Sequence, residues 1–232
     1  GLNTLAGGGT FLTFPALIYT GVPPVAANAT SAIAVFPGYL GGAIGFKNEI
    51  AAYDGKRLLR IVVFTAVGGL MGSALLLVSS NEAFSVMVPF LLAAATLAFA
   101  FGDRIQAWIQ RHRIGKPEGP AGTLLVSIYG GYFNGGLGIV LLALFSLWGM
   151  RDLNTMNGLK NGLSFVLSVV SVVTFSLAGL VAWPQAAVMM LAATVGGYLG
   201  APLARIVPRT VIRGLVIGIG ILMSAIFLLR IP

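Results

Sequence analysis

The sequence predicts an all-α integral membrane protein that contains an internal duplication. Hydrophobic residues make up 57% of the chain and charged residues only 9%, whereas roughly a quarter of the residues of soluble proteins are charged. The mean hydropathy is +0.96. Most apolar runs are near 20 residues long, enough to cross a hydrocarbon core about 30 Å thick. About eight such segments are expected, at residues 1–20, 25–46, 58–79, 83–102, 122–149, 156–180, 184–204 and 210–229.

The duplication is visible as a recurring glycine motif. Val-Gly-Gly-Leu-Met-Gly begins at Val67, and Val-Gly-Gly-Tyr-Leu-Gly begins 128 residues later, at Val195. Its glycines recur every four residues, a spacing that lets helices approach closely. We expect a four-segment repeat over 1–102 with a truncated beginning, a basic cytoplasmic linker over 103–121 and a second repeat over 122–232. Duplicated apolar units with glycine-broken segments are typical of secondary transporters.

The first segment of each repeat is expected to be broken. Within residues 122–149, five glycines fall between Gly130 and Gly138, and that many glycines disfavour a continuous helix. Each flank is about ten residues, or about 15 Å of helix, enough to reach the middle of a bilayer and return. Such a break is tolerated in lipid only where protein or a polar cavity covers it, so it should face inward.

The positions of the basic residues favour inverted over parallel repeats. If each first segment returns to its own side, each repeat has an odd number of crossings and the second repeat is inverted. Twelve basic residues then lie on one side of the membrane and Arg230 lies on the other. With eight full crossings, nine of these residues would lie on one side and four on the other. Positively charged loops concentrate on the cytoplasmic side. The twelve are Lys47, Lys56, Arg57, Arg60, Arg104, Arg111, Arg113, Lys116, Arg151, Arg205, Arg209 and Arg213.

The same composition excludes several function classes. All six acidic residues lie in loops or at segment ends, which disfavours a cation carrier or a carrier with a buried proton-binding carboxylate. The net charge of +8 resides in loops, so membrane lipid, not nucleic acid, is the expected partner. Cysteine is absent, and the single His112 has no partner spacing for a metal or for nucleophilic catalysis. We therefore expect no cofactor, no metal and no enzymatic activity.

The remaining intramembrane polar groups suit a small anion. Lys160 supplies an ammonium within the run Asn157-Gly158-Leu159-Lys160-Asn161. Near the 128-residue repeat offset, with a one-residue slip, this run aligns with Asn28-Ala29-Thr30-Ser31 at the start of the second segment. Helix N-termini at the repeat interface would add N–H groups and positive dipole ends. In the alternative interpretation, Lys160 extends to the basic face while the amides and hydroxyls only join helices. The candidate substrate-binding residues are Gly8, Asn28, Thr30, Ser31, Asn134, Gly136, Asn157, Lys160 and Asn161.

Several of these residues also carry a family resemblance. The run Gly7-Gly8-Gly9 followed by Pro15, then Gly21-Val22-Pro23-Pro24 and Ala27-Asn28-Ala29-Thr30-Ser31, resembles the signature of the TauE/SafE sulfite exporter family, also called probable membrane transporter proteins. The resemblance spans the whole chain. It implies transport of sulfite, sulfonates or related anions across the bacterial cytoplasmic membrane. The second copy departs from the pattern, with Ala143 in place of the proline and Leu159-Lys160 in place of Thr-Ser.

The leading hypothesis is a secondary carrier that exports a sulfur oxyanion or organosulfonate by alternating access. An anion channel is the nearest alternative, because the same polar groups would serve a continuous pore. A membrane subunit with a structural or partner-binding role is a third. The sequence leaves open the coupling ion, the direction of flux and the oligomeric state, a homo-oligomer included.

Overall fold

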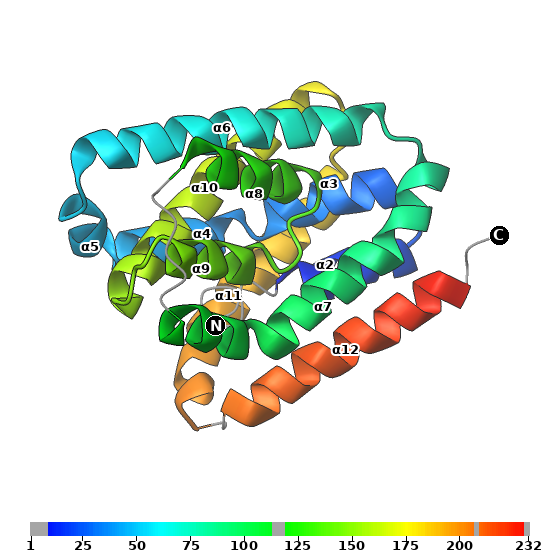
Figure 1. Cartoon of the computed structure of the whole chain (residues 1–232). Helices are drawn as coiled ribbons and strands as arrows, with labels where there is room; N and C mark the ends of the chain where they lie inside the picture. Colours follow the sequence, from blue (N-terminus) through cyan, green and yellow to red (C-terminus); the bar gives the residue numbers. More distant parts are fainter. Residues whose placement is uncertain (1–8, 113–118, 207–208, 230–232) are drawn as a thin grey trace.

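The computed structural model describes residues 9–112, 119–206 and 209–229, and every regular element within these ranges is an α-helix (Figure 1). The all-α prediction is therefore confirmed for the described chain. Gly8 and residues 113–118 of the basic linker lie outside the described residues. The helices are α2 (Thr10–Tyr19), α3 (Pro24–Ala34), α4 (Phe36–Gly45), α5 (Lys47–Ala51), α6 (Gly55–Val78), α7 (Asn81–Arg111), α8 (Pro120–Tyr132), α9 (Leu137–Leu147), α10 (Leu153–Leu177), α11 (Trp183–Ile206) and α12 (Arg209–Leu229).

Three stretches of the described chain are long and apolar enough to cross a membrane. They are α6, the Asn81–Ala98 part of α7, and α10. Shorter apolar stretches follow in α9, at Trp183–Val195 of α11 and at Val216–Leu229 of α12. This pattern supports a multi-pass membrane protein, while the count of eight segments stays a prediction.

The helix predicted to break within residues 122–149 is interrupted between Tyr132 and Leu137. Gly136 takes a φ of +72° there, a left-handed conformation that side-chain-bearing residues rarely adopt. A Cβ on this glycine would also lie 2.9 Å from the Cβ of Ala95 in α7. The chain turns back, so α8 and α9 form a hairpin whose open ends lie at the end of the bundle where α6 begins (Figure 1).

A second interruption divides residues 25–46, which the apolar pattern presents as one continuous segment. Helix α3 ends at Ala34 and α4 begins at Phe36, with Pro37 in its first turn. Proline has no N–H to donate to the carbonyl of Ile33, and its ring crowds the preceding turn. The segment is therefore kinked near its middle.

Helices at equivalent positions of the two halves begin 128 residues apart. Helix α6 begins at Gly55 and α11 at Trp183, and both contain 24 residues. Helix α7 begins at Asn81 and α12 at Arg209. In Figure 1, α6 runs from left to right and α11 from right to left, while α7 runs from right to left and α12 from left to right. Along the horizontal of this view, each helix thus runs in the direction opposite to its counterpart.

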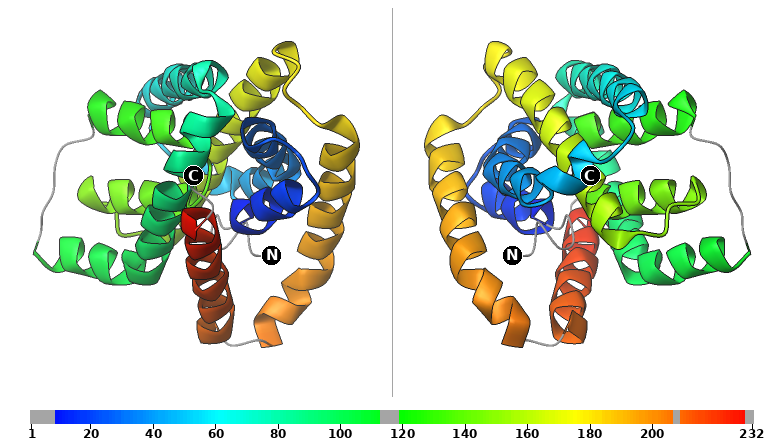
Figure 2. Two further views of the ribbon diagram at one scale, coloured as in Figure 1. Left: turned by 90° about the vertical axis from the view of Figure 1, so that its right-hand side faces the viewer. Right: turned by 90° about the vertical axis from the view of Figure 1, so that its left-hand side faces the viewer.

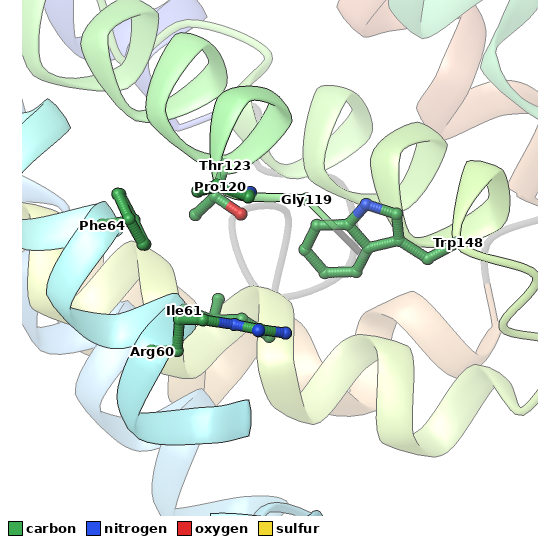
Figure 3. Close-up of a pocket in the computed structure, with 7 residues that line it drawn as sticks. All are labelled: Arg60, Ile61, Phe64, Gly119, Pro120, Thr123 and Trp148. Carbon is green, nitrogen blue, oxygen red and sulfur yellow. The ribbon is translucent and has the colours of Figure 1, made fainter. Parts of the chain in front are cut away.

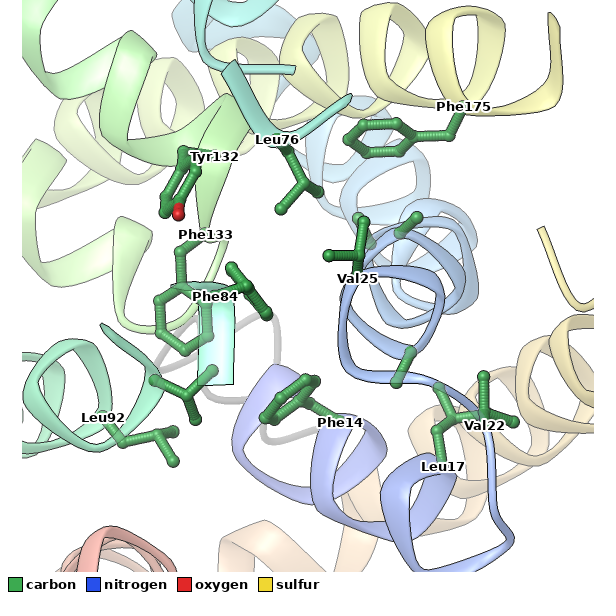
Figure 4. Close-up of a cluster of buried hydrophobic side chains, with 14 of the residues drawn as sticks. Phe14, Leu17, Val22, Val25, Leu76, Phe84, Leu92, Tyr132, Phe133 and Phe175 are labelled. Carbon is green, nitrogen blue, oxygen red and sulfur yellow. The ribbon is translucent and has the colours of Figure 1, made fainter. Parts of the chain in front are cut away.

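Helices α2 to α4 occupy the middle of the bundle. Figure 2 shows them between the α8–α9 hairpin on one side and α11 on the other. Nine of the eleven residues of α3 are buried, among them Asn28, Thr30 and Ser31. A cluster of buried side chains joins these layers, with Phe14 of α2 packed edge to face on Phe84 of α7 and on Phe133 beyond α8 (Figure 4).

Glycines of the recurring motif let α6 and α8 approach closely, as their spacing predicts. A Cβ on Gly72 would lie 2.1 Å from the carbonyl oxygen of Ile128, and one on Gly68 would lie 2.7 Å from that of Leu124. No side chain larger than hydrogen fits at such backbone contacts. This packing fixes the position of the hairpin, and with it the break between α8 and α9.

Candidate anion-binding site

Lys160 lies on the first half of α10 and is 1% exposed. It is the one charged side chain among the buried residues of the described ranges. Its Nζ donates to Oδ1 of Asn157 at 2.9 Å, and Nδ2 of Asn157 donates to the carbonyl of Leu153 at 2.9 Å. A buried ammonium is costly unless a counter-charge or strong hydrogen bonds compensate it, and a bound anion is one such counter-charge.

Asn161, the next residue, is fully buried against α4. Neither atom of its carboxamide has a hydrogen-bond partner. The amide lies over Gly42, where a Cβ would be 2.7 Å from Cγ of Asn161. A buried polar group left unpaired costs about 1–3 kcal/mol, so an amide with both ends unpaired is suited to a ligand that enters between α10 and α4.

Asn28 connects the first half of the chain to the broken helix of the second. Its Nδ2 donates to the carbonyl of Tyr132 at 2.8 Å. Tyr132 is the last residue of α8, and the final carbonyls of a helix lack intrahelical donors. Oδ1 of Asn28 is buried and has no partner. The residue therefore holds the helix end while keeping one acceptor unused.

The loop between α8 and α9 is held by two tyrosines. The hydroxyl of Tyr39, from α4, donates to Oδ1 of Asn134 at 3.4 Å. The hydroxyl of Tyr129 donates to the carbonyl of Gly135. Tyr39 lies directly after the kink at Pro37, so the kink of one half contacts the break of the other.

Thr30 and Ser31 bond to neighbouring helices elsewhere. Oγ1 of Thr30 accepts from the backbone N–H of Ala182, just before α11, at 3.1 Å. Oγ of Ser31 lies 2.5 Å from Oγ1 of Thr13 in α2. These contacts match the alternative in which the hydroxyls join helices. The structure thus separates Thr30 and Ser31 from the contacts that Asn28 and Asn134 make at the break.

Two further serines share the face of α10 that carries the predicted residues. Ser164 is fully buried and Ser168 is 2% exposed, and neither hydroxyl has a hydrogen-bond partner. The sequence signal was a polar residue at every third or fourth position, which places them on one helix face. We name this set the α10 polar stripe: Asn157, Asn161, Ser164, Ser168 and Ser171.

A surface hollow lies apart from these groups. Figure 3 shows it between α6, the start of α8 and the residue that follows α9, lined by Arg60, Thr123 and Trp148 among others. None of the predicted binding residues lines it. It therefore plays no part in the candidate site, which is closed and buried.

Asp152 fixes the start of α10 and lies outside the apolar span. Its carboxylate accepts from the hydroxyl of Thr155 at 2.5 Å and from the backbone N–H groups of Thr155 and Asn154. These bonds, the Thr155 hydroxyl first, lower the pKa of Asp152 below its ordinary value, although partial desolvation opposes them. A capping carboxylate stabilises the helix that carries Lys160.

Comparison with known proteins decides the family. The model described as "Sulfite exporter TauE/SafE" matches residues 1–227. The chain belongs to this family. The TauE/SafE resemblance seen in the glycine run and in the Asn28 to Ser31 region is thereby confirmed.

Curated relatives match this TauE/SafE member over nearly the whole of the given chain. It is 27% identical over 226 residues to a "Probable membrane transporter protein" of Haemophilus influenzae, covering 97% of this chain and 88% of the relative. It is 25% identical over 227 residues to "Probable membrane transporter protein YfcA" of Escherichia coli K12, covering 97% and 83%. "Probable membrane transporter protein ORF9" of a Sinorhizobium species is 26% identical over 226 residues, covering 96% and 85%. No solved structure matches significantly.

Proposed function

We propose that this TauE/SafE protein is a secondary transporter of the bacterial cytoplasmic membrane that exports a small sulfur-containing anion, sulfite or an organosulfonate, by alternating access. The family match and the names of the relatives support a membrane transporter with no enzymatic step. The choice of a sulfur anion follows from the family description and from the chemistry of the buried groups.

The observation that carries the proposal is the buried Lys160 among uncharged donors. Asn161, the next residue, offers an unpaired Nδ2 and is fully buried. A positive charge beside neutral hydrogen-bond donors attracts a negative ion. Asn157 holds the ammonium in place, because its Oδ1 accepts from Nζ.

An inverted repeat accounts for the arrangement of the helices. The starts of α6 and α11, and of α7 and α12, are separated by the same 128 residues as the glycine motif, and the paired helices run in opposite horizontal directions in Figure 1. Transporters built this way bind substrate near the bilayer midplane, where discontinuous helices meet. Here the kink between α3 and α4 meets the break between α8 and α9 through Tyr39 and Asn134.

This arrangement suggests how access would alternate. The hairpin α8–α9 packs on α6 through glycines, and α3 packs against α2, α10 and α11. Rocking of one group of helices against the other would open the buried amides first to one side and then to the other. The hydrogen bonds of Asn28 to Tyr132 and of Tyr39 to Asn134 join the two groups and would break and re-form in each cycle.

Flux measurements on purified protein test the function. In proteoliposomes, sulfite efflux should saturate and should accelerate when sulfite is placed on the opposite side. Sulfate, thiosulfate, taurine and sulfoacetate serve as competitors that define the substrate. Ohmic sulfite currents without acceleration would instead identify an anion channel, and the absence of flux for every one of these anions would refute the proposal.

A further inference from the structure

The unpaired hydroxyls of α10 lie on a defined face of that helix. Ser164 follows Asn161 by three residues and precedes Leu167 by three, so it points about 60° away from each. Asn161 contacts Gly42 of α4, while Cδ2 of Leu167 lies 2.6 Å from the Cβ position of Gly69 in α6. Ser164 therefore faces the space between α4 and α6.

The level of these serines along the bundle follows from two contacts between α4 and α10. Asn161 lies opposite Gly42, and the ring of Phe165 stacks on that of Phe36 with centroids 5.3 Å apart. The two segments are antiparallel (Figure 1), so moving forward along α10 means moving backward along α4. Ser168, three residues beyond Phe165, thus lies near the level of Ile33, on the α3 side of the kink.

Between that level and the level of Asn161, buried polar groups of α10 lie alongside groups of other helices. Pro37 cannot donate to the carbonyl of Ile33. Tyr39 contacts Asn134 from the α8–α9 break, and the level of Ser164 corresponds to the turn that contains Tyr39. Oγ of Ser164, Oγ of Ser168 and the amide of Asn161 are all unpaired and all at least nine-tenths buried. Native structures rarely leave buried polar atoms unpaired without a reason, and a transient ligand is one such reason.

We infer that Asn161, Ser164 and Ser168 form an uncharged path of successive hydrogen-bond donors that conducts an oxyanion from the Lys160 region to the α3–α4 kink. The inference rests on the proposed function and extends it by two substrate-contacting residues, Ser164 and Ser168. Helical rise separates these side chains by about 4.5 and 6 Å along the axis. One small oxyanion would therefore contact two donors at a time and pass from pair to pair.

The chemistry of the path selects an ion with several equivalent oxygens. A pyramidal or tetrahedral oxyanion has lone pairs in several directions, so it can accept from the next donor before leaving the previous one. Neutral hydroxyls and amides bind such an ion without trapping it, because the ion is not paired with a fixed opposite charge along the path. Lys160 would attract the ion, and the serines would let it move on.

Sulfite flux through the full-length chain in proteoliposomes tests the path, with Ser164→Ala, Ser168→Ala and the double variant. Ser146→Ala is the matched control, because the buried Ser146 hydroxyl already donates to the carbonyl of Leu142 at 2.9 Å. We expect the double variant to raise the KM for sulfite at least about tenfold with an unchanged or higher Tm, and the control to leave the KM unchanged.

The outcomes separate the two proposals. If the wild type transports sulfite and the double variant has the wild-type KM, the path is wrong and the proposed function stands. If the double variant loses flux together with Tm at an unchanged KM, the serines are structural and the path is again wrong. If the wild type transports no sulfur anion, the proposed function is refuted and the path with it.

Discussion

Asn161 of α10 lies directly over Gly42 of α4, and the absence of a side chain at position 42 makes room for the carboxamide. A Cβ at residue 42 would lie 2.7, 2.8 and 3.0 Å from Cγ, Oδ1 and Nδ2 of Asn161. This contact joins the kinked segment of the first half to the helix that carries Lys160. It therefore determines where the unpaired amide is held.

Gly42→Ala should displace this amide. Overpacking of this kind costs about 1–3 kcal/mol, so we expect a lower Tm in detergent and a reduced sulfite flux. Gly41→Ala is the matched control, because nothing lies within 4 Å of a Cβ at that position. Asn161→Ala added to Gly42→Ala should restore the Tm but not the flux, and a Gly42→Ala variant that behaves like Gly41→Ala would contradict the contact.

Replacement of Lys160 should reduce anion transport more than stability. Lys160→Gln removes the charge and keeps an amide that can donate to Asn157, so the hydrogen bond within α10 can persist. We expect sulfite flux at subsaturating concentration to fall at least about tenfold, the loss of one charge-assisted hydrogen bond. Lys56→Gln, at an exposed position of α6, is the control. Unchanged flux in Lys160→Gln would remove the lysine from the site.

Asn28→Ala should weaken the attachment of α3 to the end of α8. The change deletes the donor to the carbonyl of Tyr132, a buried hydrogen bond of 2.8 Å. Leaving that carbonyl unpaired costs about 1–3 kcal/mol, which a thermal unfolding assay in detergent would detect. Asn48→Ala, at an exposed position, should leave the Tm unchanged. An equal response of the two variants would show that Asn28 does not hold the helix end.

The lowered pKa of Asp152 predicts that the stability of the protein depends on pH. The pKa of Asp152 in the folded protein is lowered by the hydrogen bonds from Thr155 and Asn154. Ionised Asp152 therefore stabilises the fold at pH values above its pKa in the unfolded chain, near 3.8, and this stabilisation is lost as the pH falls through the folded pKa. Asp152→Asn should therefore have a lower Tm than the wild type at neutral pH. The difference should shrink as the pH falls below about 4, and a difference that grows with acidity would reverse the assigned sign.

Cysteine labelling tests the membrane topology, because the natural chain has no cysteine. Gly119→Cys and Arg151→Cys flank the α8–α9 hairpin, and Ser80→Cys lies in the turn between α6 and α7. If the hairpin is re-entrant, an impermeant thiol reagent should label positions 119 and 151 from the same side of the membrane and position 80 from the other. Labelling of 119 and 151 from opposite sides would refute the re-entrant hairpin and the inverted repeat with it.

Local glycine content was sufficient to predict the interruption between Tyr132 and Leu137 and the close packing at Gly68 and Gly72. The kink between α3 and α4 was missed, although Pro37 marks it, because the apolar run continues through it. Ser164 and Ser168 were also missed: serines in apolar helices usually bond to their own backbone, and only neighbouring helices determine whether a hydroxyl is left unpaired.

The sequence by itself determined the helical class, the family and the position of one lysine within an apolar segment, because hydropathy, glycine content and charge act locally along the chain. The tertiary structure decided which polar groups meet. Thr30 and Ser31 were predicted beside Lys160, but their hydrogen bonds go to Ala182 and Thr13. Asn28 reaches Tyr132 across 104 positions of sequence, and such a contact depends on how the helices pack, which no local pattern records.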